Sequence, residues 1–197
     1  MPIVDTKEKF IKELKKFTGD NIFTSFKDDH IVIEETEEDG QGRVLLDISD
    51  YKDENIFFVK IEHKSSHTIG RNNNHNDGIV MKVNLDTQDI EVLLFELKKT
   101  LRFNKLETAS KQLFNAYTFI KYLQLEECFQ IVYKFYICYK ANKLERDIDT
   151  LKDLQGYHFK LFEAVYEKKD QLPLMVPFCE YKEFEFYQIE FGETIRV

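Results

Sequence analysis

The sequence has few of the residues that mark fibrous, low-complexity or disulfide-rich proteins. Its 197 residues include only 7 Gly, 3 Pro and 3 Cys, while 43% are hydrophobic and 32% are charged. This composition excludes collagen-like, low-complexity and wholly disordered classes. The cysteines, Cys128, Cys138 and Cys179, are odd in number and widely spaced. We therefore expect reduced thiols in a cytoplasmic protein.

Long hydrophobic runs are also missing. The longest span residues 92–95 and 172–178, whereas a membrane helix needs ~20 apolar residues. Residues 1–5 show no basic region followed by an apolar core, so no secretory signal is expected. We expect no membrane association, and a length near 200 predicts a single domain over residues 1–197.

A basic excess is absent as well, because 36 acidic residues outnumber 28 basic ones and the net charge is −8. This balance excludes a nonspecific nucleic-acid coat. The acidity is concentrated in residues 34–39, 47–54 and 180–193, whereas residues 98–111 hold five basic side chains and one acid. The net charge therefore does not exclude a local site that binds phosphate.

Hydrophobic periodicity predicts an α/β fold. The expected elements are a helix over residues 6–17, strands over 31–33, 43–48, 56–63, 78–84 and 90–98, a helix over 106–123 and a strand over 129–139. Residues 65–76 are polar and predict a loop. Further on, residues 142–155 predict a helix, residues 157–166 fit either a strand or a helix, and residues 181–191 predict an edge strand.

Three charged residues are expected to converge on the hairpin formed by the two central strands. Glu96 and Lys98 share one face of their strand because side chains alternate. If the turn is centred between residues 86 and 87, Asp77 lies opposite Glu96, and such neighbours have Cβ atoms ~5 Å apart. Two close carboxylates repel each other, and a divalent cation removes this repulsion. Oxygen ligands of this kind suit Mg²⁺ or Mn²⁺, with the lysine placed to orient a metal-bound water or to stabilise developing charge. The pattern predicts metal-assisted hydrolysis of a phosphodiester.

These residues resemble the PD-(D/E)XK nuclease superfamily, over about residues 56–139. Asp77 is followed ~20 residues later by Glu96-Leu97-Lys98, at the end of an apolar strand, and then by a helix carrying Ala109 and Gln112. The resemblance implies a restriction-endonuclease-like αβββαβ core with a mixed central sheet flanked by helices, at about residues 5–140. The C-terminal extension, at about residues 141–197, would be α/β.

The resemblance also implies roles for individual residues. Asp77, Glu96 and the main-chain carbonyl of Leu97 would bind Mg²⁺ or Mn²⁺, Lys98 would position the attacking water, and Gln112 would brace the site. The expected activity is nucleic-acid cleavage in defence, restriction or repair, with DNA expected ahead of RNA. A homodimer or a partner protein is a further expectation.

Other candidates surround this core constellation. In some branches of the superfamily a tyrosine follows the glutamine, and here Tyr117 comes one residue later than in that pattern. The acid of the opening helix is either Glu8 or Glu13. Glu62 and His63 are candidates for an outer metal ligand. The residues expected to contact substrate are Lys99, Arg102, Lys111, His75 and Arg71.

Two other classes fit the same sequence. The fold could be kept as a catalytically inactive module that binds another protein through its acidic surface. It could also be a regulatory module that senses a nucleotide. A glycine-rich phosphate loop is absent from the sequence, so an NTPase is not supported.

Overall fold

The computed structural model describes residues 7–18, 22–24, 26, 29–34, 42–51, 55–60, 77–151, 156–175 and 182–196. The helices are α1 (Lys7–Thr18), α2 (Phe103–Tyr122), α3 (Ile148–Leu151) and α4 (Gly156–Tyr166), with short 3-10 helices at Ser49–Tyr51, Leu125–Glu127 and Leu144–Asp147. The strands are β1 (Ile22–Phe23), β2 (His30–Glu34), β3 (Arg43–Asp47), β4 (Asn55–Val59), β5 (Gly78–Asn84), β6 (Asp89–Leu101), β7 (Gln130–Asn142), β8 (Gln171–Leu174), β9 (Lys182–Glu190) and β10 (Thr194–Arg196).

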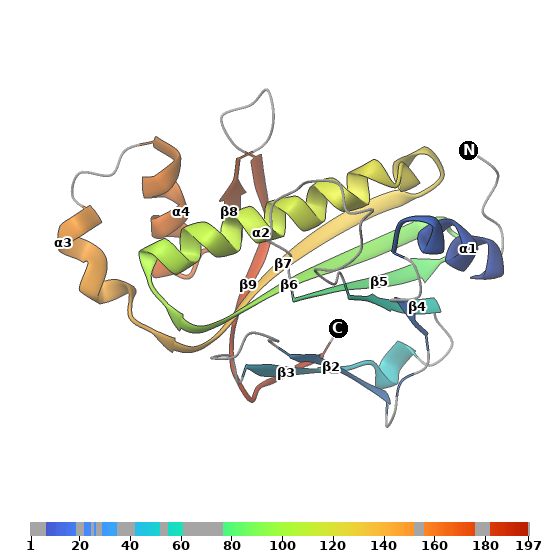
Figure 1. The fold of residues 1–197 in the computed structure, drawn as a ribbon, viewed down its shortest axis with the longest axis horizontal. Helices are drawn as coiled ribbons and strands as arrows, with labels where there is room; N and C mark the ends of the chain where they lie inside the picture. The colour runs from blue at the N-terminus through green and yellow to red at the C-terminus, as the bar shows by residue number, and fades with distance from the viewer. Residues whose placement is uncertain are drawn as a thin grey trace.

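Two sheets of unequal size organise the chain (Figure 1). The large sheet has the order β1-β4-β5-β6-β7-β9-β8, and the small sheet has the order β10-β3-β2. In the large sheet, β6 runs parallel to β7 and β7 runs parallel to β9, whereas the other pairs are antiparallel. The predicted α/β class with a mixed sheet is confirmed.

The two faces of the large sheet are covered differently. The helices α1, α2 and α4 bury apolar side chains against one face, where Phe10, Leu113 and Leu161 belong to one cluster. The small sheet packs on the opposite face, where Ile33 and Leu46 contact a second cluster. We expected helices around the sheet, but in the described part of the chain they cover one face only. The other face is closed by a sheet whose alternating strands β2 and β3 have one apolar side.

Strand β6 is the centre of the molecule. Its residues 92–98 are all buried. This burial is expected for a strand whose two faces are both covered, because the sequence of such a strand is a nearly continuous apolar run. Because β6 and β7 are parallel, their connection must cross over the sheet, and the 20-residue helix α2 makes that crossing. The helix, the strand before it and the strand after it therefore form one βαβ unit.

Several predicted elements need correction. The strands expected at 31–33 and 43–48 do not join the main sheet, because they pair with each other and with β10. Residues 142–155 contain a 3-10 helix and the four-residue α3 in place of one helix. Residues 157–166 are helical. The strand expected at the sheet edge, β9, is interior, because β8 pairs with its far side.

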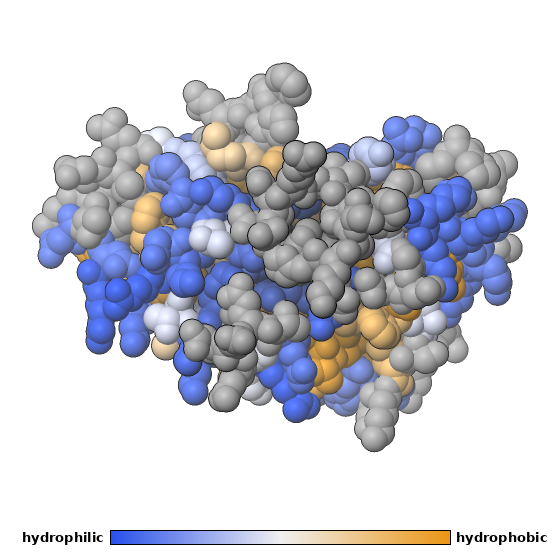
Figure 2. All heavy atoms as spheres, viewed as in Figure 1, coloured by the Kyte–Doolittle hydropathy of each residue, from blue (hydrophilic) through white to orange (hydrophobic). Residues whose placement is uncertain are grey.

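One apolar area of the outer surface lies on the small sheet. Figure 2 shows hydrophobic side chains gathered over the β2 side of the small sheet, where Val32 is exposed. None of the helices in the described ranges is long and apolar enough to cross a membrane.

Candidate active site

The β5–β6 hairpin has the predicted register. Its pairs run from Asn84–Asp89 at the turn to Gly78–Phe95 at the other end, so Asp77 lies one step beyond, next to Glu96. The main-chain N–H of Leu97 donates a hydrogen bond to Oδ2 of Asp77 at 2.6 Å. The Asp77 carboxylate is therefore held against the main chain of the strand segment that carries Glu96 and Lys98.

Glu96 and Lys98 form a buried ion pair. Glu96 is completely buried and accepts a hydrogen bond from the Lys98 ammonium, whose side chain is 11% exposed. Both side chains point from β6 toward the face covered by α2. Side chains two residues apart on a strand share a face, and Val92 and Leu94 on the same strand belong to the core cluster on the α2 side. The predicted sharing of one face by Glu96 and Lys98 is confirmed.

The thiol of Cys138 lies on the strand next to the site. Cys138 lies beside Leu97 across the β6–β7 pair and is fully buried. Burial raises its pKa well above the ordinary value, and the charges of Asp77, Glu96 and Glu193 raise it further. The thiol is therefore held in its neutral form.

Helix α2 brings polar side chains over the same sheet face. Gln112 is 8% exposed and lies among the buried residues of α2, as does Ser110. The residues that are both buried and polar or charged in the described chain are Thr18, Glu96, Lys98, Ser110 and Gln112. Four of these five lie on β6 and α2, so the buried polarity of the core is concentrated in the region where the site was predicted.

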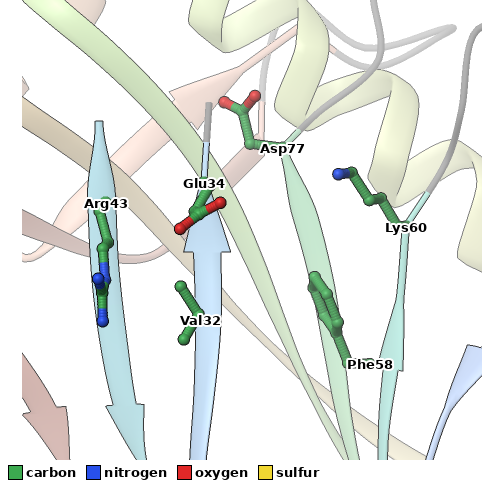
Figure 3. A pocket seen from close by; sticks show the side chains of 6 residues that line it. All are labelled: Val32, Glu34, Arg43, Phe58, Lys60 and Asp77. Atoms are coloured by element: carbon green, nitrogen blue, oxygen red, sulfur yellow. The ribbon is translucent and has the colours of Figure 1, made fainter. Parts of the chain in front are cut away.

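A cavity of about 270 Å³ opens between the two sheets beside Asp77 (Figure 3). Its walls are formed by residues of β2, β3 and the end of β4 together with Asp77: Val32, Glu34, Arg43, Phe58, Lys60 and Asp77. Figure 3 shows Asp77 at the end of β5, between Glu34 and Lys60. Glu34, Arg43 and Lys60 were not predicted as site residues. Their segments precede Asp77 by 17 or more positions, and no spacing rule links them to it.

A second cavity adjoins the first. It has a volume of about 330 Å³ and is lined by Arg43, Leu45, Lys140, Phe191 and Gly192. Arg43 lines both cavities, so the two are neighbours on the small sheet. Their lining includes the basic residues Arg43, Lys60 and Lys140 and the acidic residues Glu34 and Asp77.

The predicted basic rim lies at the junction of β6 and α2. Lys99 and Arg102 are exposed there, and Arg102 is the residue that precedes α2. Lys111 is exposed as well, but its ammonium pairs with Glu107 at 3.0 Å one helical turn earlier. Lys99 and Arg102 therefore lie at the junction of β6 and α2, whereas Lys111 forms an ion pair with Glu107 on the helix.

Two further candidates lie in other surroundings. Tyr117 packs in the apolar core against Tyr133, with ring centroids 4.9 Å apart, and against Phe184. Glu13 pairs with Lys16 on α1 at 2.6 Å. The apolar face of α1 contacts Phe57 and Phe129, and Phe129 immediately precedes the start of β7. Glu96 pairs with Ile137, eight residues further along, so the structure brings neither Tyr117 nor Glu13 into contact with Glu96. Glu8 is exposed on the same helix.

The remaining predicted residues, Arg71, His75, Glu62 and His63, lie outside the described ranges. Within those ranges, no group of three or more His, Cys, Asp and Glu side chains could hold a metal ion. Asp77 and Glu96 supply two carboxylates, and a hard cation such as Mg²⁺ commonly uses one or two carboxylates together with water and substrate phosphate. The described residues are therefore compatible with a Mg²⁺ or Mn²⁺ site that includes main-chain oxygen or water.

Comparisons of this chain with protein-family models, with curated proteins and with solved structures found no match.

Proposed function

We propose that this protein is a metal-dependent nuclease with a site of the PD-(D/E)XK type. The observation that carries the proposal is the hydrogen bond from the Leu97 N–H to the Asp77 carboxylate, which holds Asp77 on the strand segment that bears Glu96 and Lys98. Asp77 also lines a cavity whose walls include Arg43 and Lys60 together with Glu34. The order of elements supports the proposal, because β4, β5, β6, α2 and β7 follow the βββαβ part of the αβββαβ core and the four strands are neighbours in the sheet, with β1, β2 and β3 inserted after α1.

The roles follow from the chemistry of the side chains. Asp77 and Glu96 would hold Mg²⁺ or Mn²⁺, which when bound supplies Lewis acidity and an activated water. The Lys98 ammonium, already beside the Glu96 carboxylate, would orient that water and stabilise charge on the phosphate. Gln112 on α2 would hold the polar groups in position from the helix side.

The two cavities lined by Arg43 supply a path for the phosphate backbone. Lys60 and Arg43 line the cavity of Asp77, and Arg43 also lines the cavity that holds Lys140. Basic side chains position a nucleic-acid backbone without reading its sequence. These residues, with Lys99 and Arg102 outside, would bring a phosphodiester to Asp77 even though the net charge is −8.

The test is cleavage of plasmid, single-stranded DNA and RNA with Mg²⁺ or Mn²⁺. Asp77→Asn preserves an oxygen that can accept from Leu97 but removes the negative charge, so we expect cleavage to fall by more than about 100-fold. Asp86→Asn is the matched control, because Asp86 is exposed at the turn of the same hairpin. Failure of wild-type protein to cleave any of these substrates with either metal would contradict the proposal.

The path along these two cavities has its own test. Arg43→Ala and Lys60→Ala should each weaken binding of nucleic acid and lower the salt dependence by about one unit of slope. Lys12→Ala, which alters an exposed lysine on α1, should leave both quantities unchanged. If all three variants behave alike, these cavities are not the substrate path.

A second candidate function is a catalytically inactive module with the same fold. The observation that favours it is the apolar surface over β2 seen in Figure 2. A partner protein or a second copy would then cover Val32, which is 38% exposed. Light scattering of wild type and Val32→Lys would show whether this surface mediates association, and absence of cleavage would accompany it.

A further inference from the structure

A separate pocket lies between α2 and α4, away from the cavity that holds Asp77. It has a volume of about 310 Å³ and is lined by Glu107, Ser110, Lys111, Phe114, Tyr157, His158 and Met175. This volume is at the small end of the range for ligand pockets, roughly 300–1,000 Å³. None of these residues except Lys111 was assigned a role from the sequence.

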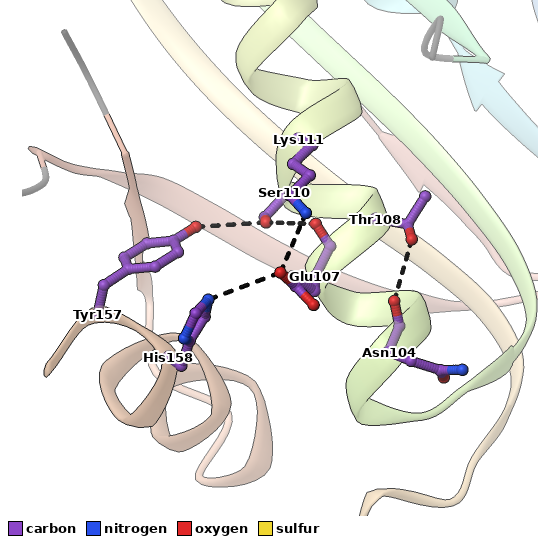
Figure 4. Close-up of polar contacts among 7 residues, drawn as sticks. All are labelled: Asn104, Glu107, Thr108, Ser110, Lys111, Tyr157 and His158. Atoms are coloured by element: carbon purple, nitrogen blue, oxygen red, sulfur yellow. Dashed lines mark hydrogen bonds and ion pairs between the residues drawn. The ribbon is translucent and has the colours of Figure 1, made fainter. Parts of the chain in front are cut away.

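The walls combine aromatic surface with an ordered polar side. Tyr157 donates a hydrogen bond to Oγ of Ser110 at 3.3 Å, and Ser110 donates to the carbonyl of Glu107 at 2.8 Å (Figure 4). The Tyr157 and His158 rings lie 5.5 Å apart, and Met175 adds an exposed apolar side chain. Burial raises the pKa of Tyr157, so its hydroxyl remains a neutral donor at physiological pH.

The carboxylate of Glu107 lies at the same side of the pocket. Lys111 approaches its Oε1 at 3.0 Å, and Nε2 of His158 lies 3.6 Å from the same oxygen (Figure 4). Because both contacts use Oε1, Oε2 can accept a hydrogen bond from a ligand. The Lys111 side chain is 62% exposed, which places a mobile positive charge outside the aromatic walls.

This combination narrows the chemistry of the occupant. A hydrocarbon would remove the Glu107 carboxylate from water without giving its Oε2 a hydrogen bond, which is costly. The Ser110 and Tyr157 hydroxyls already donate to the carbonyl of Glu107 and to Ser110, respectively. A small cation would meet Lys111 and His158, and an anion without donors would meet the Glu107 carboxylate. A neutral planar ring with N–H donors and ring acceptors satisfies the aromatic walls, the hydroxyls and the carboxylate together.

We propose that the pocket between α2 and α4 binds a nucleobase, with Glu107 accepting from an N–H of the base and Ser110 and Tyr157 hydrogen-bonding the ring. Tyr157, His158 and Phe114 provide the apolar contact, and Lys111 is placed to meet a phosphate attached to the base. The base is supplied either by a free nucleoside or nucleotide or by a single-stranded nucleic acid. This site does not depend on the proposed nuclease activity.

The experiment is titration of the full chain with the four ribonucleosides, their 5′-monophosphates and short single-stranded oligonucleotides, followed by calorimetry or ligand-observed NMR. Tyr157→Phe keeps the ring and removes the hydroxyl, and Glu107→Gln keeps the shape and removes the charge. Each should weaken binding roughly three- to tenfold, the effect of losing one hydrogen bond. Glu126→Gln is the control, because Glu126 also pairs with a lysine of α2 but at the other end of the helix.

The outcomes separate the sources and test the site. Binding of free nucleosides as tight as that of oligonucleotides identifies a metabolite site, whereas binding that requires the oligonucleotide identifies a bound strand. Either result supports nucleobase binding in this pocket if Tyr157→Phe and Glu107→Gln weaken the affinity and Glu126→Gln leaves it unchanged. Absence of binding by every ligand at millimolar concentration would overturn the proposal, as would binding that is unchanged in both pocket variants. Thermal melting of each variant shows whether it is folded.

Discussion

Strand β6 carries two glutamates that pair with lysine in opposite surroundings. Glu91 contacts Lys82 and Lys134 on the face toward the small sheet, and its side chain is 21% exposed. Glu96 contacts Lys98 on the face toward α2 and is completely buried. The odd spacing of five residues puts the two clusters on opposite faces of the same strand.

The difference shows what each cluster contributes. Water screens the Glu91 cluster, and its two lysines more than balance one carboxylate; such pairs contribute little stability. The Glu96–Lys98 pair pays a desolvation cost that an apolar pair of similar size would avoid. Retaining a buried charged pair in an otherwise apolar strand is therefore better explained by a function of the pair than by stability, and this agrees with the proposed active site.

The largest expected effect comes from breaking the buried pair. Lys98→Met leaves the Glu96 carboxylate buried without its ammonium, which should lower the free energy of unfolding by about 3–5 kcal/mol. Lys134→Met removes one of two partly exposed partners of Glu91 and should cost about 1 kcal/mol or less. Urea denaturation of both variants measures the contrast, and equal losses would show that the two clusters do not differ in the way described.

A double variant sharpens the same comparison. Glu96→Leu with Lys98→Met removes both charges, so most of the stability lost in Lys98→Met should return. A double variant less stable than Lys98→Met would show that the pair contributes net stability, and the functional argument from its burial would fail. The same protein should have no cleavage activity if Glu96 and Lys98 act as proposed.

A smaller effect is expected from pH. Burial would raise the pKa of Glu91, but hydrogen bonds from Lys134 and Lys82 outweigh it and leave the pKa below the ordinary 4.5. A carboxyl with a lowered folded pKa stabilises the protein above its unfolded pKa, and this contribution is lost as the pH falls through the folded pKa. The free energy of unfolding of Glu91→Gln should therefore be about 1 kcal/mol lower than that of the wild type near pH 7. Below the folded pKa of Glu91 the two proteins should be nearly equally stable.

Stability curves of wild type, Glu91→Gln and Glu145→Gln between pH 7 and strongly acid conditions measure this. Glu145 is exposed in the 3-10 helix Leu144–Asp147, so its variant should follow the wild type. A Glu91→Gln curve that remains parallel to the wild type down to the lowest pH would contradict the assignment of the lowered pKa.

The last prediction needs no substitution and concerns the chemical labelling of two thiols. Cys138 is buried with a raised pKa next to the Asp77 and Glu96 carboxylates, whereas Cys128 is partly exposed. Since the thiolate is the reactive form, iodoacetamide should modify Cys128 in the native protein and Cys138 only after unfolding. Peptide mapping by mass spectrometry distinguishes them, and rapid native labelling of Cys138 would mean that the interior beside the site opens readily.

The central hairpin could be predicted because its signals are local. The turn between Asn84 and Asp89 sets the register, and that register decides which residues meet across the strands. Helix α2 was predicted from its apolar face, although it begins at Phe103 rather than at Leu106. The position of Asp77 next to the strand segment with Glu96 and Lys98 follows from the turn and the register of the hairpin. It needs no other part of the chain.

The rest of the site depends on contacts between distant segments. Arg43 reaches the region of Asp77 because β3 pairs with β2 and with β10, at the far end of the chain. Lys60 comes there because β4 pairs with β5. The pairing of β3 with β10 has no short-range signal, since alternating strands look alike whichever sheet they join. The pocket between α2 and α4 was missed for the same reason.

By itself, the sequence determined the α/β class, the β5–β6 register and the shared face of Glu96 and Lys98, because side-chain alternation and turn position are local properties of the chain. Tertiary structure alone decided that Glu96 and Lys98 are sealed beneath α2, that the small sheet closes the opposite face, and that β9 is interior rather than at an edge. Those outcomes are set by which apolar surfaces cover one another, and for the small sheet that depends on the pairing of β3 with β10, more than 100 residues away.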